Sequence, residues 1–381
     1  MGAAAKLAAG HTALGELLGG RIREGGPLTF AEYMGESLYH PEHGYYSRAE
    51  AKRFADYYTS VDVHPVFGRL LARQLAEMWV ALGRPGEFTA VECGAGAGSL
   101  AEHILDFAAR GLPEFFASLR YVAVEQSPAR GAACQARLAR HVGGGRAAVR
   151  AQLPERVAAG CIFSNELLDA LPVHRVVCEG GELREVYVTL DGARFADHPG
   201  PLSTAGISDY FAEQGITLRQ GQHAEAGLAA ADWVAQAGRA LGRGFVLTID
   251  YGHEARELYD ERHMRGTLLA YHRHRAGEDW YAHPGEQDLT AHVNFTALGL
   301  AGARGGLGRT GLTTQTNFLL ALGRDNDFAD LFDEGMSEAE RVRARQGLKS
   351  LIDPEGMGET FRVLIQHKGE DTPRLTGLQP L

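Results

Sequence analysis

Short apolar runs alternate with stretches of helical periodicity through most of this 381-residue chain. The apolar runs have the length of strands and predict strands over 88–93, 120–125, 147–150, 161–166, 244–252, 309–315 and 361–367. Apolar residues recur at helical spacing over 63–83, 98–110 and 128–141. Because strands that alternate with helices join through right-handed crossovers, we expect an α/β fold. Its expected form is a mostly parallel twisted sheet with helices on both faces.

The first sixty residues carry helix signals of their own. Residues 12–25 have helical periodicity, and a second helix is predicted to begin at Thr29, a good N-cap residue. Glu32 follows three positions later, which is the spacing of a capping box. We therefore expect residues 1–62 to form an N-terminal helical cap segment.

The main α/β domain is predicted to span 63–381, and two stretches interrupt its alternation. Residues 173–240 contain a predicted hairpin that turns at Gly180-Gly181, and residues 253–300 are rich in turns. No internal repeat or strong linker separates either stretch from its neighbours. We therefore expect both to be insertions that cover a cleft, without forming separate domains.

A glycine-rich turn follows the first predicted strand of this domain, in the sequence AVECGAGAGSL. Gly94, Gly96 and Gly98 stand at alternate positions, and the acid Glu92 precedes them. Glycine lets a nucleotide-like ligand approach the backbone and allows a positive φ in the turn. A dinucleotide fingerprint would place Gly or Ala at the sixth position, where this chain has Ser99. The G-x-G-x-G form instead resembles motif I of class I methyltransferases that use S-adenosylmethionine, whose cationic groups Glu92 could help neutralise.

A second acid supports a nucleoside-bearing ligand. The apolar sequence LRYVAV ends at Glu125, and an acid at the end of the second strand can accept hydrogen bonds from both ribose hydroxyls. Enzymes that use NAD share this feature, so Glu125 indicates a ribose without naming the cofactor. We predict that Glu125 and the adjacent Gln126 contact the cofactor. The alternative is a tight strand–helix turn beside a surface acid.

Composition narrows the function classes. The formal net charge is −10 and the isoelectric point about 5.9, which disfavours nucleic acid as a principal partner. No segment approaches the ~20 apolar residues of a membrane span. The cysteines show no C-x-x-C spacing and the histidines no metal-binding pattern, so we expect reduced thiols, a cytoplasmic protein and no metal site.

A second cluster of polar residues stands at the end of the fourth predicted strand, in SNELLDALPVHR. Asn165, Glu166 and Asp169 interrupt an otherwise apolar segment there. Substrate groups collect at the carboxyl ends of strands in open α/β sheets, which favours a functional role for the three. The alternative is that Asn165 and Asp169 cap a short helix.

Four sequence blocks together resemble the MidA family of class I methyltransferases. They are FAEYMGESLYHPEHGYYS at 30–47, VECGAGAGSLAEHIL at 91–105, SNELLDALPVHR at 164–175, and GTLLAYHRHRAGEDWYAHPGEQDLTAHVNF at 266–295. That family includes the mitochondrial arginine methyltransferase needed for assembly of respiratory complex I. The resemblance implies a Rossmann-like class I fold, S-adenosyl-L-methionine as cofactor, and methyl transfer to an arginine of a protein substrate. A complex I subunit is the candidate substrate, and the oligomeric state is left open.

The resemblance also assigns residues. The loop from Gly94 through Ala95, Gly96 and Gly98 matches the family's cofactor loop, and Glu125 matches its ribose acid. The signature that faces the reaction centre matches Asn165, Glu166 and Asp169, and Thr59-Ser60 matches a pair near the cofactor. The chain departs from the family pattern at Val61-Asp62, where Pro-Glu is usual, and at Asn294, where the family has aspartate.

These assignments suggest a mechanism for arginine. A carboxylate can hold the guanidinium in a fork and localise its charge, and Glu166 is the first choice for that role, with Asp169 second. His292 or Asp288 could pass on the released proton, although a lone histidine is more often a hydrogen-bonded core residue. Trp280-Tyr281 could shape a substrate groove or belong to the core. The alternatives are a small-molecule methyltransferase of the same fold and a cofactor-binding assembly chaperone with vestigial catalysis.

Overall fold

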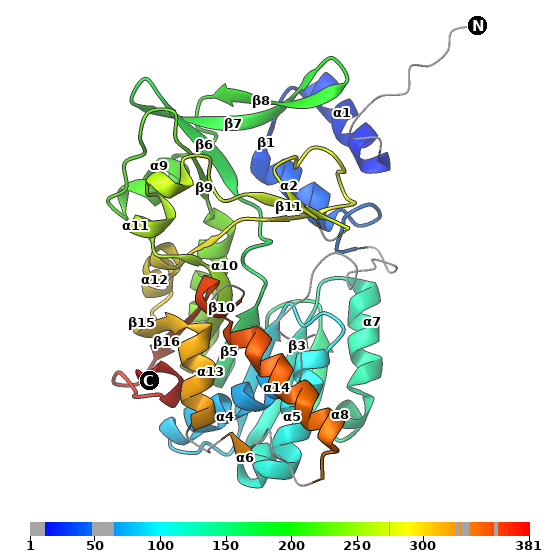
Figure 1. Ribbon diagram of the computed structural model, residues 1–381, viewed down its shortest axis with the longest axis vertical. Helices are drawn as coiled ribbons and strands as arrows, with labels where there is room; N and C mark the ends of the chain where they lie inside the picture. Colours follow the sequence, from blue (N-terminus) through cyan, green and yellow to red (C-terminus); the bar gives the residue numbers. More distant parts are fainter. Residues whose placement is uncertain (1–11, 48–64, 274, 325–327, 330–334, 354–356) are drawn as a thin grey trace, which may run out of the picture. The chain divides into compact units, whose positions relative to one another are not determined.

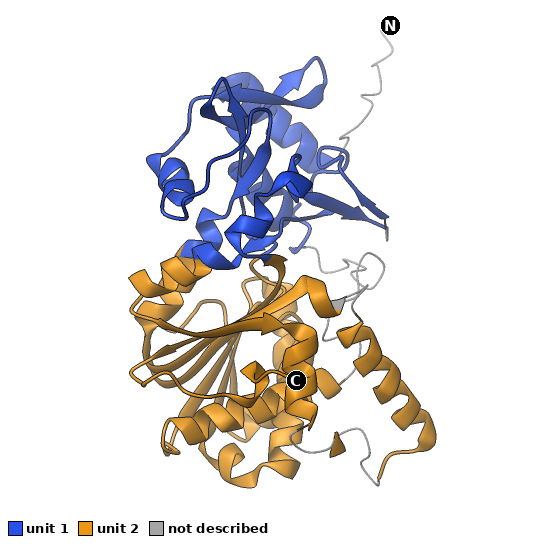
Figure 2. Ribbon diagram, turned by 60° about the vertical axis from the view of Figure 1, so that its left-hand side comes forward, with its two compact units in different colours: residues 1–57, 169–231, 253–297 blue, residues 58–168, 232–252, 298–381 orange. Residues whose placement is uncertain are grey.

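The computed structural model describes residues 12–47, 65–273, 275–324, 328–329, 335–353 and 357–381. The chain divides into two compact units, which Figure 2 colours separately. Unit 1 contains residues 1–57, 169–231 and 253–297, and unit 2 contains residues 58–168, 232–252 and 298–381. The N-terminal segment therefore belongs with most of the two insertions, a grouping that the sequence did not suggest.

Unit 2 is built on a twisted sheet whose main path has the strand order β15–β16–β10–β5–β2–β3–β4 (Figure 1). Its strands are β2 (Phe88–Cys93), β3 (Leu119–Val124), β4 (Ala147–Arg150), β5 (Val157–Asn165), β10 (Leu241–His253), β15 (Gly308–Thr314) and β16 (Phe361–Lys368). The strands from β10 to β4 are parallel, and β16 is antiparallel to both of its neighbours. The predicted α/β architecture with a mostly parallel sheet is confirmed.

Helices cover this sheet because its central strands β2, β5 and β10 are buried along nearly continuous runs, so both of their faces need cover. One face buries Ala90 and Phe163 in the main hydrophobic core, together with residues of the helices on that side. The helices of unit 2 are α4 (Val66–Ala81), α5 (Ser99–Gly111), α6 (Pro113–Ser118), α7 (Pro128–Arg137), α8 (Ala139–Gly143), α10 (Leu228–Ala240), α12 (Phe295–Arg304), α13 (Gln315–Arg324), α14 (Glu338–Ile352) and α15 (Met357–Thr360), of which α10 and α12 begin in unit 1. On the opposite face, the Gln366 side chain lies against Gly302 of α12.

Unit 1 contains two smaller antiparallel sheets and a few short helices. Its elements are α1 (Ala13–Gly25), β1 (Leu28–Thr29), α2 (Phe30–Tyr39), β6 (His174–Glu179), β7 (Glu182–Asp191), β8 (Arg194–Gly200), α9 (Ala205–Ala212), β9 (His223–Ala226), α11 (Ala255–Leu258), β11 (Leu269–His272), β12 (Arg275–Gly277), β13 (Asp288–Thr290) and β14 (Val293–Asn294). One sheet follows the order β1–β7–β6–β9 with β8 beside β7, and the other has the order β12–β11–β13. Two apolar clusters, one of them around Tyr33 and Met34 of α2, form the core of this unit.

Local sequence signals account for several boundaries. Thr29 caps α2 and shares a reciprocal capping box with Glu32, as predicted. The β6–β7 hairpin turns at Gly180 and Gly181, both with positive φ, also as predicted. Strand β5 begins four residues before its predicted start. The prediction missed these residues because most of them are small and do not form a conspicuous apolar run. Gly160 belongs to this part of the strand, where an added Cβ would lie within 2 Å of the Thr89 carbonyl oxygen of β2.

The predicted helix over 128–141 is two helices, α7 and α8, separated by Leu138 alone. Backbone hydrogen bonds from Leu138 to Cys134 and from Val142 to Leu138 continue across the junction, so the break is a local change of ψ. Among the described helices, none combines the length and apolar character that crossing a bilayer requires.

Candidate active site

The glycine loop between β2 and α5 has the backbone conformation that its sequence predicts. Gly94, Gly96 and Gly98 have φ values of +77°, +58° and +82°, which side-chain-bearing residues rarely adopt. A Cβ on Gly96 would lie 2.6 Å from Nη2 of Arg130, and one on Gly98 would lie 2.8 Å from Sγ of Cys134. The dihedral angles therefore favour glycine at all three positions, and the close approach of Cys134 adds a steric reason at Gly98.

The loop is fastened to the neighbouring strand through its backbone. The amides of Gly94 and Ala95 both donate to the Val124 carbonyl at the end of β3, at 2.9 and 3.0 Å. Leu167, which follows β5, packs on the other side, 3.1 Å from where a Gly94 Cβ would stand. The loop is thus held between the carboxyl ends of β3 and β5, at the edge of the sheet where ligands of α/β proteins bind.

Glu125 lies directly beside this loop. Its Oε2 accepts a hydrogen bond from the Gly96 amide and its Oε1 one from the Ser127 amide, both at 2.9 Å. Arg130 Nη2 lies 3.8 Å from Oε2, and the Glu125 side chain is 7% exposed. Each carboxylate oxygen can accept more than one hydrogen bond, so this carboxylate can also receive two ribose hydroxyls. The loop and Glu125 therefore fit a nucleoside, and Gln126 is exposed beside them.

Glu92 points into the protein core. Its Oε2 accepts a hydrogen bond from the Tyr121 hydroxyl at 2.7 Å, and the residue is 4% exposed. Burial raises the pKa of Glu92 to about 8, the Tyr121 hydrogen bond opposes that rise, and the nearby Glu125 adds to it. The structure thus supplies Glu92 with a protein partner, and contact with a cationic cofactor group stays a prediction.

The raised pKa of Glu92 predicts a pH-dependent contribution to stability. The folded protein favours the neutral carboxyl, so the contribution is complete below the unfolded pKa of about 4.5 and is lost as the pH rises through about 8. Glutamine is always neutral, so the stability of Glu92→Gln does not depend on this titration. The difference in free energy of unfolding between Glu92→Gln and the wild type should therefore grow in favour of the variant as the pH rises from 5 to 8, by roughly a few kcal/mol in total. Urea unfolding of both proteins at each pH measures the difference. Glu155→Gln, at an exposed position, should show none, and a pH-independent difference for Glu92→Gln would refute the explanation.

Strand β5 ends in the predicted acid signature, and the backbone turns sharply there. Glu166 has a φ of +52°, in the left-handed region, and its amide donates to the Ile249 carbonyl of β10 at 3.0 Å. Asn165 Nδ2 donates to Glu166 Oε1 at 3.0 Å. Among the described residues, the buried Asn165 Oδ1 has no hydrogen-bond partner. A left-handed conformation costs a residue such as glutamate about 1–2 kcal/mol and is typically retained at functional positions.

The third member of the signature, Asp169, is counted in unit 1 and has its own surroundings there. It is buried, and its carbonyl accepts a hydrogen bond from the Ala291 amide at 3.0 Å. Burial raises the pKa of Tyr271, and the charges of Asp169 and Asp288 add to the rise. Asp288 accepts hydrogen bonds from the Tyr46 hydroxyl at 2.8 and 3.0 Å. Unit 1 thus places Asp169 and Asp288 both close enough to Tyr271 for their charges to act on it.

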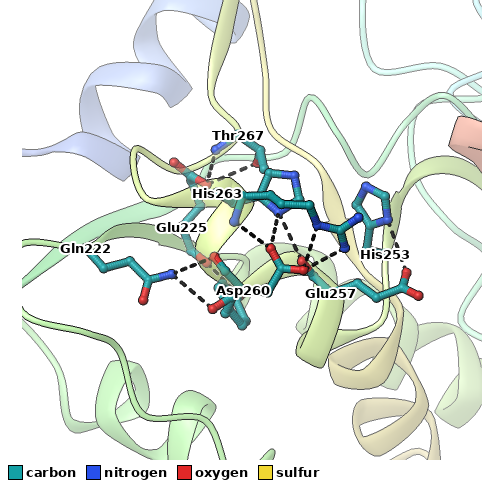
Figure 3. Close-up of polar contacts among 9 residues, drawn as sticks. Gln222, Glu225, His253, Glu257, Asp260, His263 and Thr267 are labelled. Carbon is teal, nitrogen blue, oxygen red and sulfur yellow. Dashed lines mark hydrogen bonds and ion pairs between the residues drawn. The ribbon is translucent and has the colours of Figure 1, made fainter.

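His292, the other candidate for proton transfer, belongs to a group of three histidines in unit 1. The ring centroids of His253, His263 and His292 lie 5.4–6.3 Å apart. Figure 3 shows Glu257 beside the first two, 3.4 Å from His253 Nδ1 through its carboxylate and 3.0 Å from His263 Nδ1 through its carbonyl. Burial and the two neighbouring histidines lower the pKa of His292 to about 4. At neutral pH His292 is uncharged and a weak base, which disfavours the proposed proton transfer.

Trp280 and Tyr281 take part in the packing of unit 1. The Arg175 guanidinium lies 4.3 Å from the Trp280 ring centroid and 5.0 Å from that of Phe30. Arg175 also forms two hydrogen bonds with Asp197, at 2.8 and 3.1 Å, and the Tyr281 hydroxyl donates to the same carboxylate at 2.6 Å. The core interpretation of Trp280 and Tyr281 therefore accounts for their contacts without a substrate groove.

The departure from the family pattern at Asn294 has a local explanation. Asn294 Nδ2 donates to Gln214 Oε1 at 2.7 Å and to the Tyr259 hydroxyl oxygen at 3.2 Å, and its Oδ1 accepts from the Ala297 amide at 3.1 Å. An aspartate could accept the last bond but could not donate the first two. Asparagine at this position therefore accepts a hydrogen bond from the first turn of α12 and donates one to Gln214.

Two predicted cofactor residues, Thr59 and Ser60, lie outside the described residues, and so does the departure at Val61-Asp62. Within the part of the chain that is described, no group of three or more His, Cys, Asp or Glu side chains is arranged to hold a metal ion.

Three residues of this region were missed by the sequence analysis. Tyr121 contacts Glu92, and Arg130 contacts Glu125. A tyrosine in a strand and an arginine in a helix are both common, so the sequence did not mark either of them as part of a site. Asp250 had a visible signal, because it is an acid within the apolar run GFVLTIDYG. An acid in a buried strand needs hydrogen-bond partners, and that requirement alone could have marked it.

Known proteins with a similar sequence or fold bear on this site. A family model described as "Putative S-adenosyl-L-methionine-dependent methyltransferase" (Methyltransf_28) matches residues 70–313. The chain is 29% identical to the protein arginine methyltransferase NDUFAF7 homolog, mitochondrial, of Drosophila melanogaster, over 96% of this chain and 87% of that protein. It is also 29% identical to the protein arginine methyltransferase NDUFAF7, mitochondrial, of Homo sapiens, over 91% and 82%.

Solved structures agree with the sequence relatives. A Burkholderia thailandensis protein crystallised with S-adenosyl-homocysteine is 31% identical, covers 96% of this chain and 94% of its own, and superposes with a TM-score of 0.84. The glycine loop and Glu125 fit the nucleoside of such a ligand, so S-adenosylmethionine is the cofactor. The family model covers well over half of the chain, and the protein belongs to this family of class I S-adenosylmethionine-dependent methyltransferases, the MidA family that its sequence blocks indicated.

Proposed function

We propose that this methyltransferase transfers methyl groups to arginine side chains of a protein substrate. The observation that carries the proposal is Glu166, a carboxylate at the carboxyl end of a central strand, whose backbone is left-handed and whose Oε1 accepts a hydrogen bond from Asn165. Relatives that match more than nine-tenths of the chain are named protein arginine methyltransferases, which supports the same substrate class.

The chemistry of arginine explains why a carboxylate is needed. The cofactor supplies a methyl group activated on a sulfonium. The acceptor guanidinium is protonated and delocalised, so it is a poor nucleophile until one nitrogen is oriented and its charge is localised. The Glu166 carboxylate can bind two N–H groups of the guanidinium and leave the third nitrogen to accept the methyl group, with S-adenosyl-homocysteine as the leaving group and one N–H proton released to solvent. Holding two reactants in line can contribute ~7–11 kcal/mol to lowering the barrier.

The identity of the substrate protein and the location of the methyltransferase in the cell are further proposals. The resemblance to the complex I assembly methyltransferase favours a respiratory complex I subunit as the acceptor. The four cysteines are free thiols, all of them buried, and we keep a cytoplasmic location as a proposal that fractionation of the source cells would test.

One experiment tests the substrate class. Lysate from cells that lack the gene is incubated with purified protein and S-adenosylmethionine carrying an isotopically labelled methyl group, and the digested proteins are analysed by mass spectrometry. We expect label on arginine in one or a few proteins. Label found only on small metabolites would indicate a small-molecule methyltransferase and overturn the proposal.

A further inference from the structure

Asp250 makes the contacts that determine the backbone course after β5. It belongs to β10, which lies beside β5 in the sheet (Figure 1), and it is fully buried. Its Oδ2 accepts hydrogen bonds from the amides of Leu167, at 3.2 Å, and Leu168, at 2.9 Å. Its Oδ1 accepts one from the Tyr251 amide at 3.1 Å. A single carboxylate on one strand thus binds two consecutive amides of the segment that leaves the neighbouring strand.

The position of these amides matters because they follow the strained residue directly. The β5–β10 ladder pairs Asn165 with Ile249, and Glu166 then takes its positive φ. Only four non-glycine residues of the described chain have a positive φ, so this conformation is exceptional here. A left-handed residue needs surroundings that hold it. Asp250 accepts two hydrogen bonds from the backbone just beyond Glu166, both at one oxygen of its fully buried side chain.

We propose that Asp250 is a positioning residue that holds Glu166 in its left-handed conformation and thereby aims the Glu166 carboxylate. The catalytic part of this proposal rests on the proposed function of Glu166, and the backbone part does not. Asp250 and Asn165 act on different parts of this segment. Asp250 fixes the backbone after Glu166, whereas Asn165 binds the side-chain oxygen Oε1 of Glu166. Without Asp250, the two amides would lose a buried acceptor and Glu166 could return to an ordinary φ.

The test compares Asp250→Asn with the wild type. Asparagine has the same shape but only one acceptor oxygen, and its amide group would face a backbone N–H. We expect the maximal rate of methyl transfer to lysate protein, per S-adenosyl-homocysteine-binding site, to fall at least about tenfold. The KM for S-adenosylmethionine should change less than about threefold, and a crystal structure should show Glu166 outside the left-handed region. Asp250→Ala, which has no acceptor, should have the larger effect on both measurements.

Glu77→Gln is the matched control. Glu77 of α4 also clamps a backbone segment through its carboxylate, accepting from the Thr376 amide at 2.9 and 3.0 Å. This variant should lose stability without losing maximal rate per binding site. An equal loss of rate in both variants would mean that Asp250 has only a general structural role, and the proposal would fail.

The two proposals can be separated. If the wild type labels no arginine, the proposed function fails, and the crystallographic comparison still decides the role of Asp250. If Glu166 keeps its positive φ in the crystal structures of the Asp250 variants, the positioning proposal is overturned, whatever the substrate. If Asp250→Ala does not fold, Asp250→Asn alone decides both measurements.

Discussion

Glu166→Gln is expected to lower methyl transfer to protein by at least about a hundredfold, a loss of roughly 3 kcal/mol of transition-state stabilisation. Glutamine has nearly the same size and keeps an oxygen that can accept the hydrogen bond from Asn165 Nδ2. The substitution therefore removes the charge and one acceptor while leaving the local turn in place. A neutral amide cannot hold a guanidinium in a charge-assisted fork, and its NH₂ group would face the N–H groups of the substrate.

Two measurements are needed to interpret this variant. The rate is measured with methyl-labelled S-adenosylmethionine and lysate protein, and cofactor affinity is measured by calorimetry with S-adenosyl-homocysteine. Affinity should stay within about threefold of the wild type, because Glu125 and the glycine loop are unchanged. Glu155→Gln, at an exposed position, should match the wild type in both. Full activity of Glu166→Gln would show that Glu166 is not the residue that binds the acceptor.

The cofactor half of the site could be predicted because its determinants are local in sequence. Gly94, Gly96 and Gly98 are required by backbone angles within one turn, and Glu125 stands at the end of the adjacent strand of a parallel sheet. Parallel strands place their carboxyl ends at one edge, so a spacing in sequence becomes a proximity in space. The hydrogen bond from the Gly96 amide to the Glu125 carboxylate shows that the two segments are in contact.

Other features depend on contacts that sequence spacing does not contain. The role of Glu92 toward the cofactor stays a prediction, and the spacing gave no sign that its side chain binds Tyr121, 29 residues away, in the core. The alternation of a strand fixes which residues share a face, but it does not say which face holds the ligand. The clamp from Asp250 to Leu168 spans 82 residues and exists only because β10 is inserted beside β5.

The grouping of the N-terminal segment with the insertions was hidden for a similar reason. Tyr46 of the N-terminal segment meets Asp288, 242 residues later, and Tyr39 donates to the Ala170 carbonyl at 2.9 Å. Each of these residues occurs in a block that the sequence analysis had marked as similar to the family, yet nothing in the spacing of the blocks indicated that they would pack together. Long-range pairing of this kind follows from the tertiary fold, which local propensity does not encode.

Gly96→Val should weaken binding of S-adenosyl-homocysteine by at least about a hundredfold, which corresponds to about 2.7 kcal/mol. Residue 96 has a φ of +58°, and a β-branched side chain there is strained by the backbone alone. In addition, the new Cβ would meet Arg130 Nη2 at 2.6 Å. If the loop moves, the hydrogen bond from the residue 96 amide to the Glu125 carboxylate is disturbed, and if Arg130 moves, its 3.8 Å contact with the same carboxylate is lost. Glu125, which is expected to accept hydrogen bonds from the ribose hydroxyls, is then displaced.

Calorimetric titration with S-adenosyl-homocysteine measures this loss, and a second glycine variant controls for the effect of valine itself. Gly86 precedes β2, has an ordinary φ and open space where its Cβ would stand, so Gly86→Val should bind like the wild type. Thermal unfolding without ligand distinguishes a lost site from a lost fold: Gly96→Val should melt cooperatively yet gain no stability from added ligand. Binding by Gly96→Val as tight as that of Gly86→Val would place the cofactor elsewhere, because no nucleoside could use the present loop without its glycine.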